Sequence, residues 1–361
     1  MTPLTIGSLF SGYGGLDMAV EQVTGATPAW FVEYDKAPSK ILAHHWPDVP
    51  NYGDVTSIDW STMPPVDILT GGYPCQPFSA AGQRKGTNDE RHLWPHVREA
   101  IRVLRPRLTI LENVAGHRSL GFDRVLGDMA EDGLHVRWTS IRASDIGAPH
   151  HRERLFILAT PTDPQGVGPG EHLKSFIAGV RPAAGGGRQD TPTDAAGERW
   201  GEGAEQPFAG TPKVTAPFGG EPPAADAEDD GLARTGTARH RRARPTDSSG
   251  GDMDWGPYAE AVQRWERLTR PAPAPTEPNT KGKPRLNAAF AEWMMGLPEG
   301  HVTQVPGISR ANQLKAIGNG VCPQQAAAAL TNLLNRTHHP AGETTPRTRT
   351  PHEEGLPIPN P

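Results

Sequence analysis

Short apolar runs alternate with helical patterns over the first 160 residues, and this alternation constrains the fold more than any other feature of the chain. Six runs have the length and composition of strands: LTIGSLF, AWFVEYD, VDILTGG, RLTILENV, HVRWTSIRA and RLFILAT. Four segments repeat apolar residues at helical spacing or follow a glycine turn: 15–23, 37–46, 91–104 and 122–133. The pattern predicts an α/β fold, a doubly wound and mostly parallel sheet with helices on both faces. Ligands of such sheets bind beyond the carboxyl ends of the strands.

The character of the sequence changes near residue 161, where Gly and Pro become frequent and apolar residues become rare. This composition predicts loops rather than a packed core. A short Asp-containing motif recurs weakly in the region, but its copies are too polar and too unevenly spaced to form a solenoid. Helices are expected again over 253–268, 286–296 and 322–335, with PAPAPTEP at 271–278 as a stiff linker. From residue 337 onward the composition predicts a disordered tail.

The charge and cysteine content exclude several classes of protein. Two cysteines in 361 residues provide no disulfide framework and no zinc-binding pair. No apolar run approaches 18 residues and no signal-peptide pattern opens the chain, so we expect a soluble, cytoplasmic protein. With a net charge of -5, any nucleic-acid contact must come from local basic patches, either 84–107 or RHRRAR at 239–244. A solvated charged surface is the alternative for both patches.

Three glycines lie between the first expected strand and the first expected helix: Gly12, Gly14 and Gly15. Glycines there allow a ligand to approach the backbone closely. Their spacing is G-x-G-G rather than the dinucleotide fingerprint, so a pyrophosphate is not required. Glu33 ends the second strand, where an acidic residue binds ribose hydroxyls, and Asp54 follows at the same expected edge. The pattern favours a site for an adenosine-bearing ligand over an ordinary tight turn with surface carboxylates.

Cys75 lies between two prolines in GGYPCQPFS, directly after the third expected strand. A cysteine held at a strand end beside a ligand site has the fixed position of a nucleophile. The alternative is a small buried hydrophobic residue, but these neighbours make a poor core sequence. Cys322 has no comparable context and is expected in the core.

Glu112 ends the fourth strand, where a carboxylate costs desolvation energy unless it has partners or a task. Arg152 and Arg154 alternate as the last strand begins, so both guanidiniums project from one face. They suit phosphate or base carbonyls, or else they are surface arginines paired with acids such as Glu153. The adjacent His150 and His151 lack further ligands at useful spacing, so no metal site is expected.

Taken together, these residues resemble the DNA (cytosine-5) methyltransferase family, of prokaryotic or phage type. The matching pieces occur in the family's order: FSGYGGLDMA, Glu33, GDV, GGYPCQPFSAAGQRKG, LENV, HRERLFI, RLNAAFAEWMMGLP and QLKAIGNGV. The chain departs from the family where it has His150-His151 in place of a frequent Gln-Arg, and Gly320 in place of a frequent serine. Both departures affect supporting contacts rather than the nucleophile.

The resemblance implies a Rossmann-like fold that binds S-adenosyl-L-methionine and methylates C5 of a flipped-out cytosine. Cys75 would attack C6, Glu112 would hold the base near N3, and Arg152 and Arg154 would hold its carbonyl. The residues implied at the cofactor are Phe10, Gly12, Gly14, Glu33, Tyr34, Asp54, Val55 and Asn319. Pro74 and Gln76 would shape the catalytic loop.

The resemblance also implies a division into domains. Residues 1–160 and 306–336 would form the catalytic domain, and 161–305 a loop-rich target-recognition region that reads double-stranded DNA. Within that region, the helix near residues 255–268 is expected to be the ordered part, and RHRRAR to supply phosphate contacts. The implied enzyme is a monomer that does not bind a membrane and acts in the cytoplasm of a prokaryotic or virus-infected cell. Three biological roles stay open for this enzyme. It could belong to a restriction-modification system with a cognate restriction endonuclease, protect a phage genome, or act as an orphan regulator.

Other activities fit the sequence less well. A tRNA cytosine-5 methyltransferase would not need the long variable region. An amino-group methyltransferase is expected to carry an Asp/Asn-Pro-Pro-aromatic loop where this chain has YPCQ. A nicotinamide oxidoreductase needs the dinucleotide fingerprint. A DNA-binding module without catalysis would not need both Cys75 and Glu112.

Overall fold

The computed structural model describes residues 3–74, 93–119, 121–162 and 253–335. These residues belong to one compact unit. Cys75, Gln76 and the basic run at 239–244 lie outside the described residues, as do most of the region from 161 to 254 and the tail from 337.

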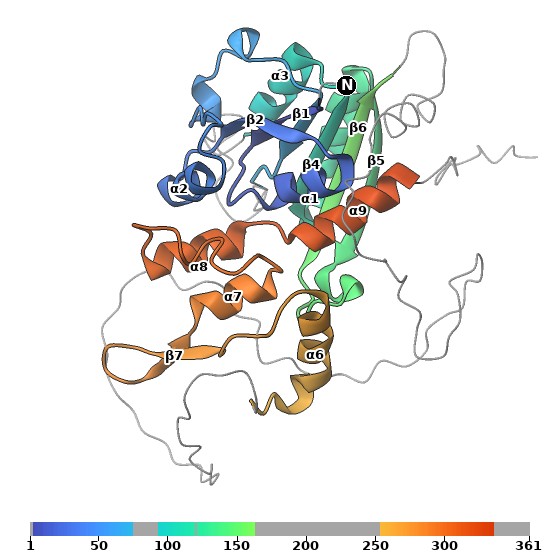
Figure 1. Ribbon diagram of the computed structural model, residues 1–361. Helices are drawn as coiled ribbons and strands as arrows, with labels where there is room; N and C mark the ends of the chain where they lie inside the picture. The colour runs from blue at the N-terminus through green and yellow to red at the C-terminus, as the bar shows by residue number, and fades with distance from the viewer. Residues whose placement is uncertain (1–2, 75–92, 120, 163–252, 336–361) are drawn as a thin grey trace, which may run out of the picture. The chain divides into compact units, whose positions relative to one another are not determined.

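Six strands form one sheet in the order β2-β1-β3-β4-β6-β5 (Figure 1). Their bounds are β1 Thr5–Leu9, β2 Thr27–Val32, β3 Ile68–Gly71, β4 Leu108–Val114, β5 Leu134–Arg142 and β6 Glu153–Pro161. β1 to β4 are parallel, whereas β6 runs antiparallel to both β4 and β5. The predicted α/β class with a mostly parallel sheet is confirmed. Because β6 runs in the opposite direction, its beginning meets the carboxyl ends of the parallel strands.

Eight α-helices are described: α1 Gly15–Thr24, α2 Lys36–His45, α3 Trp94–Leu104, α4 Phe122–Glu131, α6 Ala259–Leu268, α7 Ala288–Met294, α8 Arg310–Asn319 and α9 Pro323–Asn335. Polar side chains at their beginnings explain where several of them start. Asp35, Asn287 and Ser309 each accept a hydrogen bond from a backbone N–H in the first turn of α2, α7 and α8. No described helix is long and apolar enough to cross a membrane.

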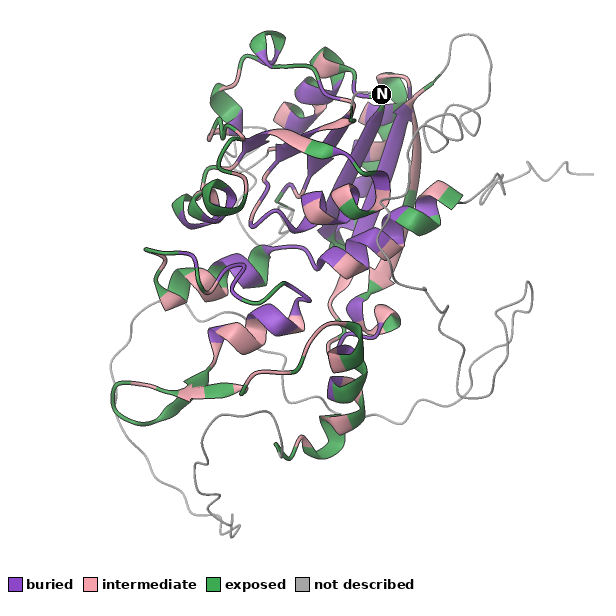
Figure 2. Cartoon of the chain, viewed as in Figure 1, coloured by how far each residue is buried: buried purple, intermediate pink, exposed green. Residues whose placement is uncertain are grey.

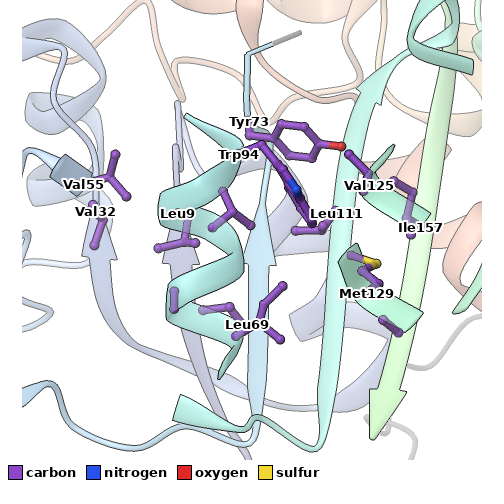
Figure 3. Close-up of a cluster of buried hydrophobic side chains, with 14 of the residues drawn as sticks. Leu9, Val32, Val55, Leu69, Tyr73, Trp94, Leu111, Val125, Met129 and Ile157 are labelled. Atoms are coloured by element: carbon purple, nitrogen blue, oxygen red, sulfur yellow. The ribbon is translucent and has the colours of Figure 1, made fainter. Parts of the chain in front are cut away.

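Helices cover both faces of the sheet, and each face has its own core (Figure 2). On one face, Trp94 of α3 and Met129 of α4 pack with Leu9, Leu69 and Leu111 of the strands (Figure 3). On the other face, α1 and α9 pack against the alternate side chains of the same strands. This alternation is the two-residue period of a strand buried on both sides.

A third core joins segments that are far apart in the sequence. Tyr13 and Ile41 from the first part of the chain belong to it, together with Trp265 of α6 and Trp293 of α7. The Trp265 indole N–H donates to the carbonyl of Trp293 at 2.9 Å. Residues 253–305 therefore share buried contacts with the sheet-bearing part of the chain. The division at residues 160 and 305 stays a prediction.

Two elements within residues 255–286 differ from the sequence expectations. A hairpin of β7 (Thr276–Pro278) and β8 (Pro284–Leu286) occupies the end of the expected linker, because the Asn279 side chain accepts from the backbone N–H of Lys281 and Lys283 and closes a turn. In the helix expected over 253–268, Val262 and Trp265 of α6 are buried, whereas Tyr258, directly before α6, and Leu268 are largely exposed.

Candidate functional site

A cleft of about 400 Å³ lies at the carboxyl ends of the parallel strands. Six of the twelve predicted site residues line it: Phe10, Gly12, Glu33, Glu112, Arg154 and Asn319. Pro74 also lines the cleft, one residue before Cys75. The topology explains this meeting, since each of the parallel strands β1 to β4 delivers its last residues to one edge.

Glu33 is held at the rim of the cleft by the glycine loop. One carboxylate oxygen accepts from the backbone N–H of Gly12 at 2.8 Å, and the other accepts from Asp35 N–H at 2.7 Å. Burial raises the pKa of Glu33 above its usual value, while these two hydrogen bonds oppose the shift. Each oxygen keeps a lone pair that can accept a hydroxyl. Gly12 itself has a φ of 58°, a left-handed conformation that favours glycine.

Glu112 and Arg154 form a buried ion pair on neighbouring antiparallel strands. Arg154 Nε lies 2.9 Å from Glu112 Oε1, and both side chains are mostly buried. Burial raises the pKa of Glu112, against the opposing charges of Arg154 and Arg152. The pair therefore places a carboxyl group with an elevated pKa in the cleft, oriented by a guanidinium.

The other predicted site residues that the structure describes do not line the cleft. The Arg152 guanidinium donates to the carbonyls of Gly318 and Gly320, behind the cleft wall. Gly14 closes a tight contact, since a Cβ there would lie 2.6 Å from the Trp46 ring. Tyr34 is 78% exposed.

Asp54 and Val55 follow the same pattern, in the loop after α2. Asp54 caps a short 3-10 helix by accepting from Thr56 N–H. Val55 packs into the core beside Val32 (Figure 3). For both of them, as for Gly14, Tyr34 and Arg152, the assigned role stays a prediction.

Several residues at the cleft were not singled out from the sequence. Asp17 of α1 is fully buried and accepts from the hydroxyls of Ser8 at 2.8 Å and Thr70 at 2.6 Å. Burial raises its pKa to about 6. Asp17 lies four residues after Tyr13 and three before Val20, on the buried stripe of α1. This helical spacing was the sequence signal that could have predicted its burial.

The charges of the cleft are mainly acidic. Four acidic and two basic residues line it: Asp17, Glu33, Asp35, Glu112, Arg154 and Lys315. Lys315 pairs with Asp35 at 2.6 Å and Arg154 pairs with Glu112, so both cations are neutralised locally. The cleft thus suits a ligand with ribose hydroxyls and a positive charge better than one with phosphates. Among the described residues, no group of His, Cys, Asp and Glu could hold a metal ion.

Residues 4–176 match the family described as C-5 cytosine-specific DNA methylase. This match covers a little less than half of the chain. The type II methyltransferase M.Bsp6I of Bacillus sp. (strain RFL6) is 33% identical over 180 residues, which cover 48% of this chain and 55% of that protein. The orphan methyltransferase M.SPRI of Bacillus phage SPR is 34% identical over 171 residues, covering 45% of this chain and 39% of that protein.

Among solved structures, the S. pombe Dnmt2 methyltransferase matches with a TM-score of 0.54 and 13% identity, covering 92% of this chain and 98% of the other. At that identity the likeness shows a shared fold. The matched part of the chain spans about half the length, or less, of the two methyltransferases named above.

Proposed function

We propose that the chain transfers a methyl group from S-adenosyl-L-methionine to C5 of a flipped-out cytosine in a specific double-stranded DNA sequence. The observation that carries this proposal is the buried Glu112–Arg154 pair, which shares its cleft with Glu33 and with Pro74, the residue before Cys75. The match of residues 4–176 to the C-5 cytosine-specific DNA methylase family supports the same reaction class.

The cleft is compatible with S-adenosyl-L-methionine. Glu33 would hold the ribose hydroxyls, and the acidic surroundings would favour the sulfonium charge. When bound, the cofactor supplies the methyl group. The absence of the dinucleotide fingerprint and the local neutralisation of Lys315 and Arg154 disfavour a nicotinamide cofactor.

The protein's own residues would act on the base. The Cys75 thiolate would add to C6 and form the S–C6 bond, and the electron pair of the C5–C6 double bond would make C5 nucleophilic. After C5 is methylated, loss of its proton to water and cleavage of the S–C6 bond would restore the ring and the thiolate. Glu112, whose pKa is raised by burial, could share a proton with N3 as charge develops there. Arg154 would keep the carboxyl group of Glu112 in place.

The decisive experiment measures transfer of labelled methyl groups to DNA by the purified chain. Wild-type protein should label unmethylated double-stranded DNA, and Cys75→Ala should reduce the label to background. Cys322→Ala is the matched control and should keep the activity, since Cys322 is fully buried and burial raises the pKa of its thiol to about 11. No transfer by wild type, or undiminished transfer by Cys75→Ala, would contradict the proposal.

Two additions sharpen this experiment. A parallel reaction with tRNA tests the RNA alternative directly. Bisulfite sequencing of DNA from cells that express the chain identifies the target sequence, which the predicted recognition region at 161–305 would read. The proposal also includes a cytoplasmic location, a monomeric state and, for the restriction-modification setting, a cognate restriction endonuclease.

A further inference from the structure

Tyr13 is fully buried in the loop between β1 and α1, and the proposed reaction gives its side chain no role. Its hydroxyl donates to the carbonyl of Val321 at 2.7 Å. Its own carbonyl accepts from His301 Nε2 at 2.8 Å. Tyr13 thus connects the loop between β1 and α1, through two hydrogen bonds, to two segments about 300 residues further along the chain.

Gly320 lies against the Tyr13 ring. Its φ of -77° and ψ of 177° describe extended backbone, which any residue adopts, so the conformation does not require glycine. A Cβ at this position would lie closer than 3.0 Å to Cε1, Cζ and Cδ1 of Tyr13, a separation that real Cβ atoms do not show. Since the ring is fully buried and close-packed, it cannot move aside cheaply. The ring of Tyr13 is therefore the reason that residue 320 must lack a side chain.

The segment beside Tyr13 carries polar groups of the site. Asn319 lines the cleft, while the carbonyls on either side of it, from Gly318 and Gly320, accept from the Arg152 guanidinium. The buried Gln325 side chain donates to the backbone carbonyl of Arg152 and so fixes the other side of this contact. A shift of Gly320 would consequently move both Asn319 and Arg152.

We propose that Tyr13 and Gly320 form a size-matched pair that positions the 318–321 wall of the cleft, with Tyr13 as a positioning residue for ligand binding. This inference rests on the proposed function, because the ligand of that wall is taken to be the methyl donor. It predicts that a methyl group on residue 320 is harmful only while the ring of Tyr13 is present.

A double-mutant cycle tests the pair. Gly320→Ala should raise the Kd for S-adenosylhomocysteine at least tenfold in calorimetry and lower the unfolding temperature. Tyr13→Val removes the ring atoms that would clash, so adding Gly320→Ala to Tyr13→Val should change neither quantity further. Tyr13→Phe keeps those atoms, so Tyr13→Phe with Gly320→Ala should bind as weakly as Gly320→Ala alone. If Tyr13→Val does not fold, Gly320→Ala alone still tests the inference, because unchanged binding and unfolding of that variant would contradict it.

Gly127→Ala is the matched control, because a Cβ at this exposed position of α4 meets nothing within 4 Å. It should leave binding and unfolding unchanged or slightly improved. The inference is overturned if Gly320→Ala behaves like Gly127→Ala, or if Gly320→Ala is as harmful in the Tyr13→Val background as in the wild-type background. Wild-type protein that neither binds S-adenosylhomocysteine nor transfers methyl groups would overturn the proposed function. The unfolding arm of the cycle would still test the pair in that case.

Discussion

Asn113 illustrates how one side chain at the sheet edge can control a neighbouring segment. It is buried, and its amide nitrogen donates to the carbonyl of Tyr73 at 3.0 Å, two residues before Cys75. Its amide oxygen accepts from the backbone N–H of Val114 at 2.8 Å. Both halves of the amide are thus used, and the end of β4 is bonded to the beginning of the segment that bears the proposed nucleophile.

Replacing this amide should impair the reaction without preventing folding. Asn113→Ala removes the buried hydrogen bond that the amide donates to the Tyr73 carbonyl, at a cost of about 1 to 3 kcal/mol. If most of this cost falls on positioning, kcat should fall by about ten- to a hundredfold. Steady-state kinetics measure it, with thermal unfolding recorded alongside. Asn332→Ala, at an exposed position of α9, is the control and should match wild type. An unchanged kcat for Asn113→Ala would show that Asn113 does not position this segment.

Residues at strand ends were predictable, whereas residues that act across the chain were not. Phe10, Glu33 and Glu112 follow apolar runs whose parallel arrangement places their ends together, so the sequence alone was enough to expect them at one edge. Lys315 and Tyr13 owe their places to partners about 300 residues away, and no local pattern announces such contacts.

At the scale of elements, helix α8 and the β7–β8 hairpin escaped prediction for different reasons. In α8 only Ala316 and Ile317 are buried, so its sequence has almost no apolar stripe to reveal a helix. The hairpin strands contain three residues each and include prolines, a pattern that predicts a linker rather than strands. Its turn depends on the side chain of Asn279 rather than on any apolar alternation.

The hairpin carries exposed positive charge that should bind the DNA backbone, given the proposed function. Lys281 and Lys283 lie at its tip and are exposed, whereas Arg285 is paired with Glu277. Each lysine that contacts a phosphate adds about 0.9 to the slope of log K against log salt, so replacing both with Ala should reduce that slope by about 1 to 2. Fluorescence anisotropy over a salt series measures it. Arg124→Ala, on α4, is the control, and an unchanged slope for the lysine variant would exclude the hairpin.

For the whole molecule, the two blocks of sequence that resemble the family are joined by a shared core rather than by a linker alone. The loop at 298–305 contributes His301, Val302 and Val305 to contacts with Tyr13 and Ile41. Burial of this kind depends on pairing between distant segments, which no local pattern in the sequence reveals. Stability of the described unit should therefore depend on groups at this junction.

His301 makes that junction sensitive to acid. Its Nε2–H donates to the Tyr13 carbonyl, its ring stacks on His45 with centroids 4.0 Å apart, and His44 lies close by. Burial lowers the pKa of His301 to about 4, from an unfolded value near 6.5. The unfolded chain binds the proton first, so the contribution of His301 is complete above pH 6.5 and is lost as the pH falls toward 4. This difference corresponds to about 3 kcal/mol.

A variant that keeps the hydrogen bond but does not titrate isolates this effect. His301→Gln can still donate to the Tyr13 carbonyl, so its free energy of unfolding in urea should fall less between pH 7.5 and pH 4.5 than that of wild type, by about 2 to 3 kcal/mol. Asp17 acts in the opposite direction, since its raised pKa favours the folded state at low pH, but it is the same in both proteins and cancels. His151→Gln, at an exposed position, should follow the wild-type profile. Parallel profiles for His301→Gln and wild type would show that protonation of His301 does not limit stability in acid and that another group is responsible for the acid sensitivity.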